Sequence, residues 1–259
     1  MQSIEDIYFI SMPDRHSLRS RLGQMLGSNS ASIPPITFKT LQPLTQMPAL
    51  VELDIADTAA LTMSLSELET LLSSLTHLKA LHLNPSPLRL NESSFGLEII
   101  PAVGRHCKEI QEFSAFFDAT RPIPLTSAVD AATLFPALVQ LCVSVSIITQ
   151  EVQGDVAIYL SDILPKKCKL SIIGTEWPGK IDDREEDVNL KWLQAIMNVR
   201  KYMWHQVSDM IDPLRQLRHS ERVKAEKAVE EATHHSNREI EELCKRLAHL
   251  ENESRGDAR

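Results

Sequence analysis

Residues 50–84, LVELDIADTAALTMSLSELETLLSSLTHLKALHLN, carry one short pattern twice. The two copies have the spacing L-x-x-L-x-L and lie 28 residues apart, at Leu50, Leu53 and Ile55 and then at Leu78, Leu81 and Leu83. Between them, leucines recur at steps of three and four residues, at Leu65, Leu68, Leu71, Leu72 and Leu75. Such steps place side chains along one face of a helix. The stretch therefore predicts a unit made of a strand followed by a helix.

The same strand spacing continues toward the C-terminus with weaker residues. The central apolar positions are Leu53, Leu81, Phe113, Leu141 and Leu170, at intervals of 28, 32, 28 and 29 residues. One such unit cannot bury both its strand face and its helix stripe, so units of this kind stack on one another. We therefore expect an α/β leucine-rich-repeat solenoid over residues 33–178, with parallel strands on its concave face and helices on its convex face.

The N-terminal end of the solenoid is expected to be irregular. The strand spacing recurs in degenerate form at Ile33, Ile36 and Phe38. A shortened first repeat of this kind can act as a capping unit. The preceding segment, 1–32, is predicted to contain a short strand at 7–10 and a basic helical piece at 17–26.

Residues 179–212 are predicted to form an acidic loop and an amphipathic helix. The apolar residues of this helix step by three and four, at Trp192, Ile196, Val199, Met203, Val207 and Met210. An apolar helix face needs a partner, and the open end of the last repeat needs a cover, so we expect this helix to cap the solenoid. Pro213 is expected to break or kink the helix, because proline cannot donate a backbone hydrogen bond and disfavours helical geometry in the residue before it.

Residues 213–259 form a charged helical tail with few apolar positions. Two heptads of an a/d pattern occur at Ile240, Leu243, Leu247 and Leu250. A sustained coiled coil needs three or four heptads. Three alternatives therefore stay open for the tail: a weak coiled coil, which would permit weak self-association, a solvated single helix, or disorder.

Composition limits the classes of partner and compartment. The chain is 43% apolar and 24% charged, with a net charge of -8, and it has no clustered Lys and Arg of the kind that binds a phosphate backbone. No stretch approaches the roughly 20 apolar residues of a membrane span, and the acidic N-terminus does not suit a signal peptide. The four cysteines form no C-x-x-C motif, which indicates buried free thiols in a reducing compartment. We therefore expect an intracellular protein, cytoplasmic or nuclear, that binds neither nucleic acid nor membrane.

The sequence contains no motif of a catalytic, cofactor or metal site. G-x-x-x-x-G-K-[ST], G-x-G-x-x-G, G-x-S-x-G and H-E-x-x-H do not occur. His106 and Cys107 lie at the end of an expected repeat helix, where an apolar cysteine fills the core. Cys244 and His249 lie on a charged helix at a spacing that fits no standard zinc site. We therefore expect no enzymatic activity, no cofactor and no metal.

The concave face is the predicted binding surface. Side chains in a strand alternate between two faces, so the neighbours of the buried central positions should point to solvent. The candidate binding residues are Glu52, Asp54, His82, Asn84, Glu112, Ser114, Phe116, Gln140 and Lys169. They make this face acidic at one end and basic at the other, and Phe116 is the expected anchor, since aromatic residues often carry interface energy. The alternative is a face that is unused, or covered by the C-terminal helix.

Five short motifs lie within residues 36–173. They are LVELDIADT, LKALHLNP, VGRHCKEIQEF, LFPALVQLCV and VAIYLSDILPKKCKLSI. Together they resemble the leucine-rich-repeat region of F-box proteins abundant in mushroom-forming fungi. In such proteins an N-terminal F-box binds the adaptor of a cullin ubiquitin ligase, and the repeats recruit the substrate. No L-P-x-E-[IL]-x-x-x-I-F signature appears in residues 1–35, so the resemblance implies that the F-box is missing, divergent or encoded upstream.

Two functional hypotheses follow from these features. The first is a non-enzymatic protein-protein interaction module that binds a protein partner on the concave face. The second, which the resemblance implies, is the substrate-recognition part of an F-box type ubiquitin ligase, for which the ligase adaptor would be a further partner.

Overall fold

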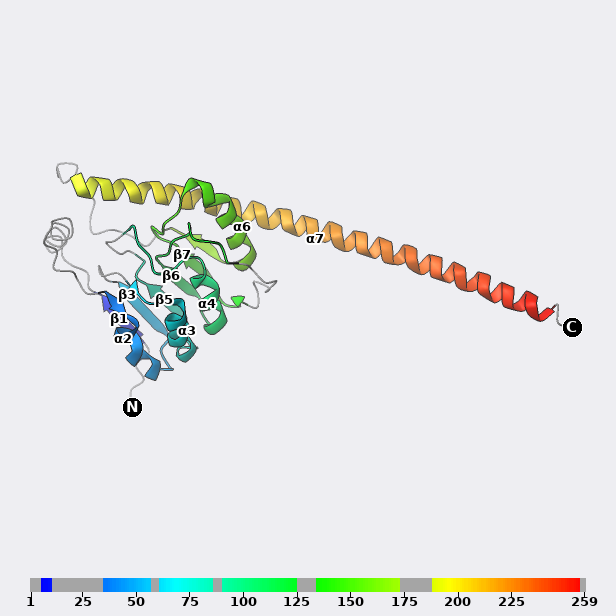
Figure 1. Ribbon diagram of the computed structural model, residues 1–259, viewed down its shortest axis with the longest axis horizontal. Coiled ribbons are helices and arrows are strands. Elements are labelled where there is room, and N and C mark those ends of the chain that lie inside the picture. The colour runs from blue at the N-terminus through cyan, green and yellow to red at the C-terminus, as the bar shows by residue number, and fades with distance from the viewer. Residues whose placement is uncertain are drawn as a thin grey trace. The chain divides into compact units, whose positions relative to one another are not determined.

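The computed structural model describes residues 6–10, 35–56, 61–85, 90–124, 134–172 and 188–256 (Figure 1). The chain divides into two compact units, Met1–Asp212 and Pro213–Arg259. The first unit has a mixed α/β fold, and the described part of the second is helical. Each unit is described by itself below.

The first unit is built on a six-stranded parallel sheet. Its strands pair in the order β1, β3, β5, β6, β7, β8, which is also their order along the chain. They span Asp6–Ile10, Glu52–Ala56, Ala80–Leu83, Glu112–Ala115, Gln140–Cys142 and Lys169–Ser171. The central positions align across neighbouring strands, in the sequence Leu53, Leu81, Phe113, Leu141 and Leu170. The parallel sheet and the five strands predicted from this spacing are therefore confirmed.

Described helices stand between β3 and β5, between β5 and β6, and between β7 and β8 in the chain. α3 spans Leu65–Ser74, α4 spans Ile99–His106, and α6 spans Gln153–Ile163 after the short 3-10 helix η2, Gln150–Val152. α3 begins with a capping box: Ser64 Oγ accepts from the Glu67 backbone N–H at 3.3 Å, and the Glu67 carboxylate accepts from the Ser64 N–H at 2.7 Å. Its inner residues Leu68, Leu71 and Leu72 are fully buried. The predicted leucine stripe is thus a stripe of the core.

The start of the sheet differs from the prediction. Ile33 lies outside the described residues, and the expected strand at 33–38 is replaced by the two-residue strand β2, Ile36–Thr37, with Phe38 starting α2, Phe38–Leu41. β2 pairs with β4, Leu61–Thr62, in a separate two-stranded sheet. The place beside β3 belongs instead to β1, which pairs along all five of its residues. The predicted strand at 7–10 is therefore present, whereas the predicted first repeat is wrong.

Proline and helix formation explain why the described residues 35–38 do not join the large sheet. Pro34 and Pro35 have no backbone N–H and cannot donate to a strand ladder. α2 and the 3-10 helix η1, Gln42–Gln46, follow directly after β2, so only two residues remain for pairing. The helical piece predicted at 17–26 lies outside the described residues.

One helix, α7, spans Val188–Gly256 and contributes to both units. It continues through Pro213, so the break predicted there does not occur. Proline removes one backbone donor from a helix, but Asp212 and Pro213 are exposed, and water can serve the carbonyl that loses its partner. In the second unit, residues 219–245 are exposed at every position. The described part of the tail is therefore an exposed helix rather than a disordered segment.

The four cysteines are all free. Cys107, Cys142 and Cys168 are buried, as expected, and burial raises the pKa of the Cys107 thiol to about 12, which keeps it protonated. Cys244 is exposed, as its place on the charged tail helix predicts, and it departs only from the general expectation of buried thiols. Among the residues described, no helix is both long and apolar enough to cross a membrane.

Candidate functional site

The sheet brings most of the predicted binding residues into two rows. Strand pairing aligns Glu52, Ala80, Glu112, Gln140 and Lys169 in one row, and Asp54, His82, Ser114, Cys142 and Ser171 in the next. Neighbouring strands lie about 4.8 Å apart, so adjacent side chains in a row are close neighbours. In β5 the burial alternates as predicted, with Leu81 and Leu83 buried and Ala80 and His82 partly exposed.

Six of the nine predicted residues are accessible, and together they form what we call the polar face. Glu112 and Lys169 are exposed, and Glu52, Asp54, His82 and Gln140 are partly exposed. The polar face is acidic over β3 and β6 and carries a lysine on the last strand, β8. Each of the strands β3 and β5–β8 thus offers at least one polar group to a partner segment that lies across the strands.

The acidic end of the polar face is partly shielded from water. Burial raises the pKa of the Asp54 carboxyl above its ordinary value, His82 beside it opposes the rise, and Glu52 adds to it. Loss of water contact therefore outweighs the attraction of His82. In β1, Asp6 stands in register with Glu52 and Tyr8 with Asp54. A cationic group placed beside Asp54 would favour its ionised form.

Three predicted residues are not available to a partner. Asn84, Ser114 and Phe116 are buried, which contradicts their prediction as solvent-facing contacts. Ser114 has a short side chain and stands between His82 and Cys142 in its row. Asn84 follows β5 with a left-handed backbone conformation, φ 45°, and its backbone N–H donates to the Ile55 carbonyl at 2.7 Å.

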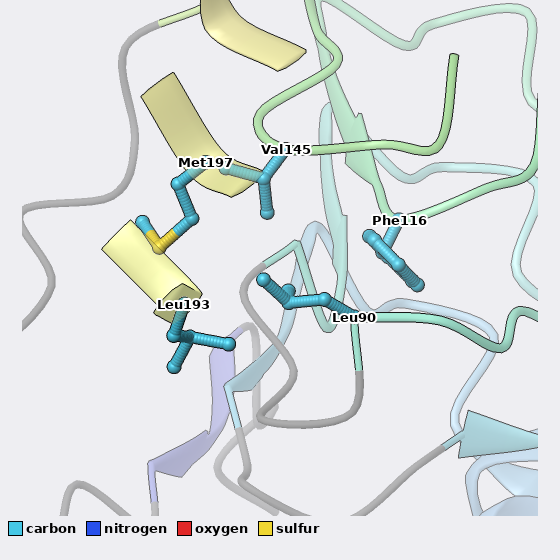
Figure 2. Packing of buried hydrophobic residues seen from close by; sticks show 5 residues of the cluster. All are labelled: Leu90, Phe116, Val145, Leu193 and Met197. Carbon is cyan, nitrogen blue, oxygen red and sulfur yellow. The ribbon is translucent and has the colours of Figure 1, made fainter. Parts of the chain in front are cut away.

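Phe116, the expected anchor, is a core residue instead. Only 7% of its surface is exposed, and it packs in a cluster with Leu90, Val145, Leu193 and Met197 (Figure 2). Leu193 and Met197 come from α7, whereas Leu90 and Val145 belong to segments that follow β5 and β7. The other members of this cluster are distant from Phe116 in sequence, so alternation within the strand could not reveal its burial.

Two polar anchors hold α7 on the first unit. Arg200 Nη1 donates to the backbone carbonyl of Leu90 at 2.7 Å and to that of Val145 at 3.2 Å. Trp204 Nε1 donates to the carbonyl of Ser146 at 2.9 Å. The helix is therefore tied to two segments that are 55 and 110 residues away from Arg200 in the chain.

The surroundings of these anchors are apolar and well paired. The Trp204 ring meets the Phe117 ring edge-on, with centroids 5.8 Å apart and an interplanar angle of 86°. Ser146 Oγ accepts from the Phe117 N–H at 3.0 Å and donates to the Ala115 carbonyl at 3.2 Å. Burial lowers the pKa of the Arg200 guanidinium and Asp118 opposes that shift, but arginine remains charged in proteins.

The buried face of α7 is not the face that the sequence predicts. Its buried residues are Leu193, Met197, Arg200, Trp204, Val207 and Ile211. The predicted stripe shares Val207 with this buried set and otherwise lies one residue away, and its Trp192 and Val199 are 53% and 52% exposed. Both faces step by three and four residues, and the true one contains an arginine, so counting apolar residues favours the wrong face. Trp204 lies on the same helix face as Leu193 and Val207. This large aromatic residue is the sequence signal that could have identified the buried face, and with it the roles of Arg200 and Trp204.

The anchors also correct the predicted role of this helix. The sequence predicts that it covers the open end of the last repeat, but Leu90, Phe116, Val145 and Ser146 lie in segments that follow β5, β6 and β7. α7 therefore covers residues that follow the C-terminal ends of these strands. This part of the predicted binding surface is closed, and the polar face is what remains open.

A small open hollow lies beside the C-terminal end of β5. It is lined by Leu61, Leu83, Asn84, Glu92, Ser93, Ser94, Phe95 and Phe116. The Ser93 hydroxyl donates to the Phe116 carbonyl at 3.0 Å and the Ser94 hydroxyl to the Leu61 carbonyl at 2.8 Å. These serines are thus engaged in holding the chain together. In the described part of the chain, no group of three or more His, Cys, Asp or Glu is arranged to hold a metal ion.

Comparisons with protein-family models, characterised proteins and solved structures found no match to this chain. The polar face and the tail helix are therefore the features on which a functional proposal rests.

Proposed function

We propose that this chain is a non-enzymatic protein-binding module, a leucine-rich-repeat solenoid that binds a protein partner on its polar face. The observation that carries the proposal is the alignment of five strands in chain order at central positions 28 to 32 residues apart. Repeats that stack in this way present equivalent positions as one continuous surface. The accessible members of those positions are the acidic, neutral and basic groups of the polar face.

The layout of the polar face suits binding better than catalysis. Glu52 and Lys169 stand at opposite ends of one row, with three strands between theirs, which separates them by about 19 Å at the usual strand spacing. A proton-transfer pair must approach to within about 3 Å. A partner segment that crosses the strands, in contrast, can contact one group per strand.

Asp54, His82 and Ser114 merit separate consideration, because they stand in register on three adjacent strands. A Ser-His-Asp triad needs the serine and the aspartate each within about 3 Å of the imidazole. Among these three described residues, no hydrogen bond of 3.5 Å or less joins His82 to Asp54 or to Ser114, and Ser114 is buried. This row therefore supports a binding role.

Affinity purification of the tagged full chain from its native cell extract tests the proposal. The variant Glu52→Lys with Glu112→Lys reverses two carboxylates of the polar face. Its matched control, Glu151→Lys with Asp162→Lys, makes the same charge change at two exposed positions on η2 and α6. We expect mass spectrometry to recover one partner with the wild type and the control, reduced at least about tenfold with the face variant, equivalent to about 1.4 kcal/mol of binding free energy. Equal recovery with all three chains would reject the polar face as the binding surface.

A second candidate function is substrate recognition for an F-box type ubiquitin ligase. The motifs between residues 36 and 173 that resemble the fungal F-box proteins favour it. If residues 1–35 hold a divergent F-box, the same purification would recover a ligase adaptor and a cullin in addition to the substrate. Reversal of Glu52 and Glu112 should then release the substrate and leave the adaptor bound, because an F-box contacts the adaptor away from the repeats.

A further inference from the structure

The tail helix of the second unit exposes apolar side chains that its own unit does not cover. Ile240 and Leu243 are 57% and 56% exposed. The neighbouring charges are paired within the helix, since Glu241 lies 2.7 Å from Lys245 and His235 lies 3.3 Å from Glu239. The polar side of this helix is thus satisfied in water, and the apolar side is left without a cover in the described part of the unit.

The apolar positions of the tail extend further than two heptads. A strict heptad read backward from Ile240 meets Thr233 and Glu226, which do not suit a core. Two additional steps of four residues, between Ala228 and Ile240, restore a continuous series of small or apolar residues: Ala225, Ala228, Ala232, Ser236, Ile240, Leu243, Leu247 and Leu250. Such four-residue insertions locally unwind a coiled coil without ending it. The helix backbone is continuous across this whole series.

We propose that two copies of this chain associate through their tails as a parallel, in-register coiled coil. With Ile240 at position a, the core positions are Ile240, Leu243, Leu247 and Leu250. Leucine at d, with isoleucine among the a residues, favours two strands over three or four. The proposal concerns the tail alone and stands independently of the polar face.

The charges beside the core select the second copy as the occupant and fix its direction. In a parallel pair, position g of one helix meets position e of the next heptad in the other. Arg246 is at g and Glu251 at the following e, so each helix places its Arg246 opposite the Glu251 of the other helix. An antiparallel pair that buries the same four core residues would set Arg246 against Arg246 and Glu239 against Glu253. Like charges disfavour that arrangement, so the sequence is complementary to itself only in the parallel orientation.

The chain contains a cysteine that can report whether the two helices run parallel or antiparallel. Cys244 is its one exposed cysteine, since the other three are buried, and it occupies position e. In a parallel dimer the two e positions lie on opposite sides of the core, too far apart for a disulfide, whose Cα atoms must lie within about 7 Å. In the antiparallel arrangement the two Cys244 residues would face each other.

Sedimentation equilibrium of the full chain over a concentration series is the first test. We expect the mass to rise from 29.1 kDa to twice that value, and Ile240→Lys with Leu243→Lys to remain a monomer at every concentration. The control, Val223→Lys, changes an exposed apolar residue outside the core series and should dimerise like the wild type. A wild-type chain that stays monomeric at its highest soluble concentration, or a control that loses the dimer with the double variant, would overturn the proposal.

Mild oxidation on a non-reducing gel is the second test. The variant Leu243→Cys with Cys244→Ser moves the only exposed thiol to position d, where two parallel helices place it face to face. We expect this variant to become cross-linked and the wild type to stay uncross-linked. The reverse pattern would show an antiparallel pair and overturn the parallel assignment.

Discussion

At the residue scale, Arg200 is a charged group that stabilises an apolar contact between distant segments. Its guanidinium supplies donors to the carbonyls of Leu90 and Val145. We predict that Arg200→Met lowers the free energy of unfolding by about 1–3 kcal/mol, because two buried acceptors lose their donor. Chemical denaturation at neutral pH measures this. The control Lys191→Met, at an exposed position of the same helix, should stay within about 0.5 kcal/mol of the wild type, and a similar loss in both variants would contradict the role of Arg200.

Phe116 is a buried core residue in the structure but an exposed binding anchor in the sequence hypothesis, so its substitution tests one against the other. Phe116→Ala should destabilise the first unit by about 3 kcal/mol, because it opens a cavity among Leu90, Val145, Leu193 and Met197. Thermal and denaturant unfolding measure the loss. A variant of unchanged stability that loses a binding partner would instead restore Phe116 as an exposed anchor.

Ionisation of Asp54 lowers the free energy of unfolding in a pH-dependent way. Its pKa in the folded chain lies above the ordinary value of 3.8, chiefly through burial, so the folded state binds the proton more tightly than the unfolded state does. The contribution of Asp54 to stability therefore falls as the pH rises from 3.8 through the raised folded-state pKa. We predict that Asp54→Asn raises the free energy of unfolding at pH 7 by a few tenths of a kcal/mol, about the scale of surface changes, and that the gain disappears in acid. A gain of equal size at both pH values would exclude ionisation as its cause.

At the element scale, α7 shows why helix periodicity alone does not select the buried face. The stripe through Trp192 and the stripe through Trp204 share Val207, are otherwise one residue apart, and both have helical spacing. The deciding acceptors are the carbonyls of Leu90, Val145 and Ser146, which come from loops that have no signature in the sequence. The presence of the helix could thus be predicted, whereas its orientation depends on contacts between distant segments.

The two tryptophans provide a matched test of that orientation. Trp204→Ala should cost about 3–5 kcal/mol, since it removes a fully buried ring, its contact with Phe117 and its hydrogen bond to Ser146. Trp192→Ala removes a ring that is mostly exposed and should change stability by less than about 1 kcal/mol. Circular dichroism during denaturation gives both values. A larger loss for Trp192→Ala would reinstate the face that the sequence predicts.

At the scale of the whole molecule, regular repetition decided what the sequence could predict. The strands at Leu53, Leu81, Phe113, Leu141 and Leu170 share one spacing, so each supports the assignment of the next. The two ends lack that support: β1 takes the place expected for the strand at 33–38, and α7 lies over the strand ends rather than capping the last repeat. The polar face was predicted where it depends on strand alternation, and it was mispredicted at Phe116, where a distant helix decides exposure.

Two truncations separate the contributions of the two parts of α7. A chain that ends at Asp212 keeps Arg200, Trp204 and the cluster around Phe116, so it should unfold cooperatively within a few degrees of the full chain's melting temperature. A chain that ends before Val188 loses both anchors and exposes Phe116, Phe117 and Val145 to water. The hydrophobic and hydrogen-bond contributions of α7 to stability then disappear together. Because single domains are stable by only about 5–15 kcal/mol, we expect the shorter chain either to aggregate or to lose cooperative melting. Differential scanning calorimetry of both chains tests this, and a cooperative transition of unchanged temperature in the shorter chain would show that α7 is dispensable for the fold of the first unit.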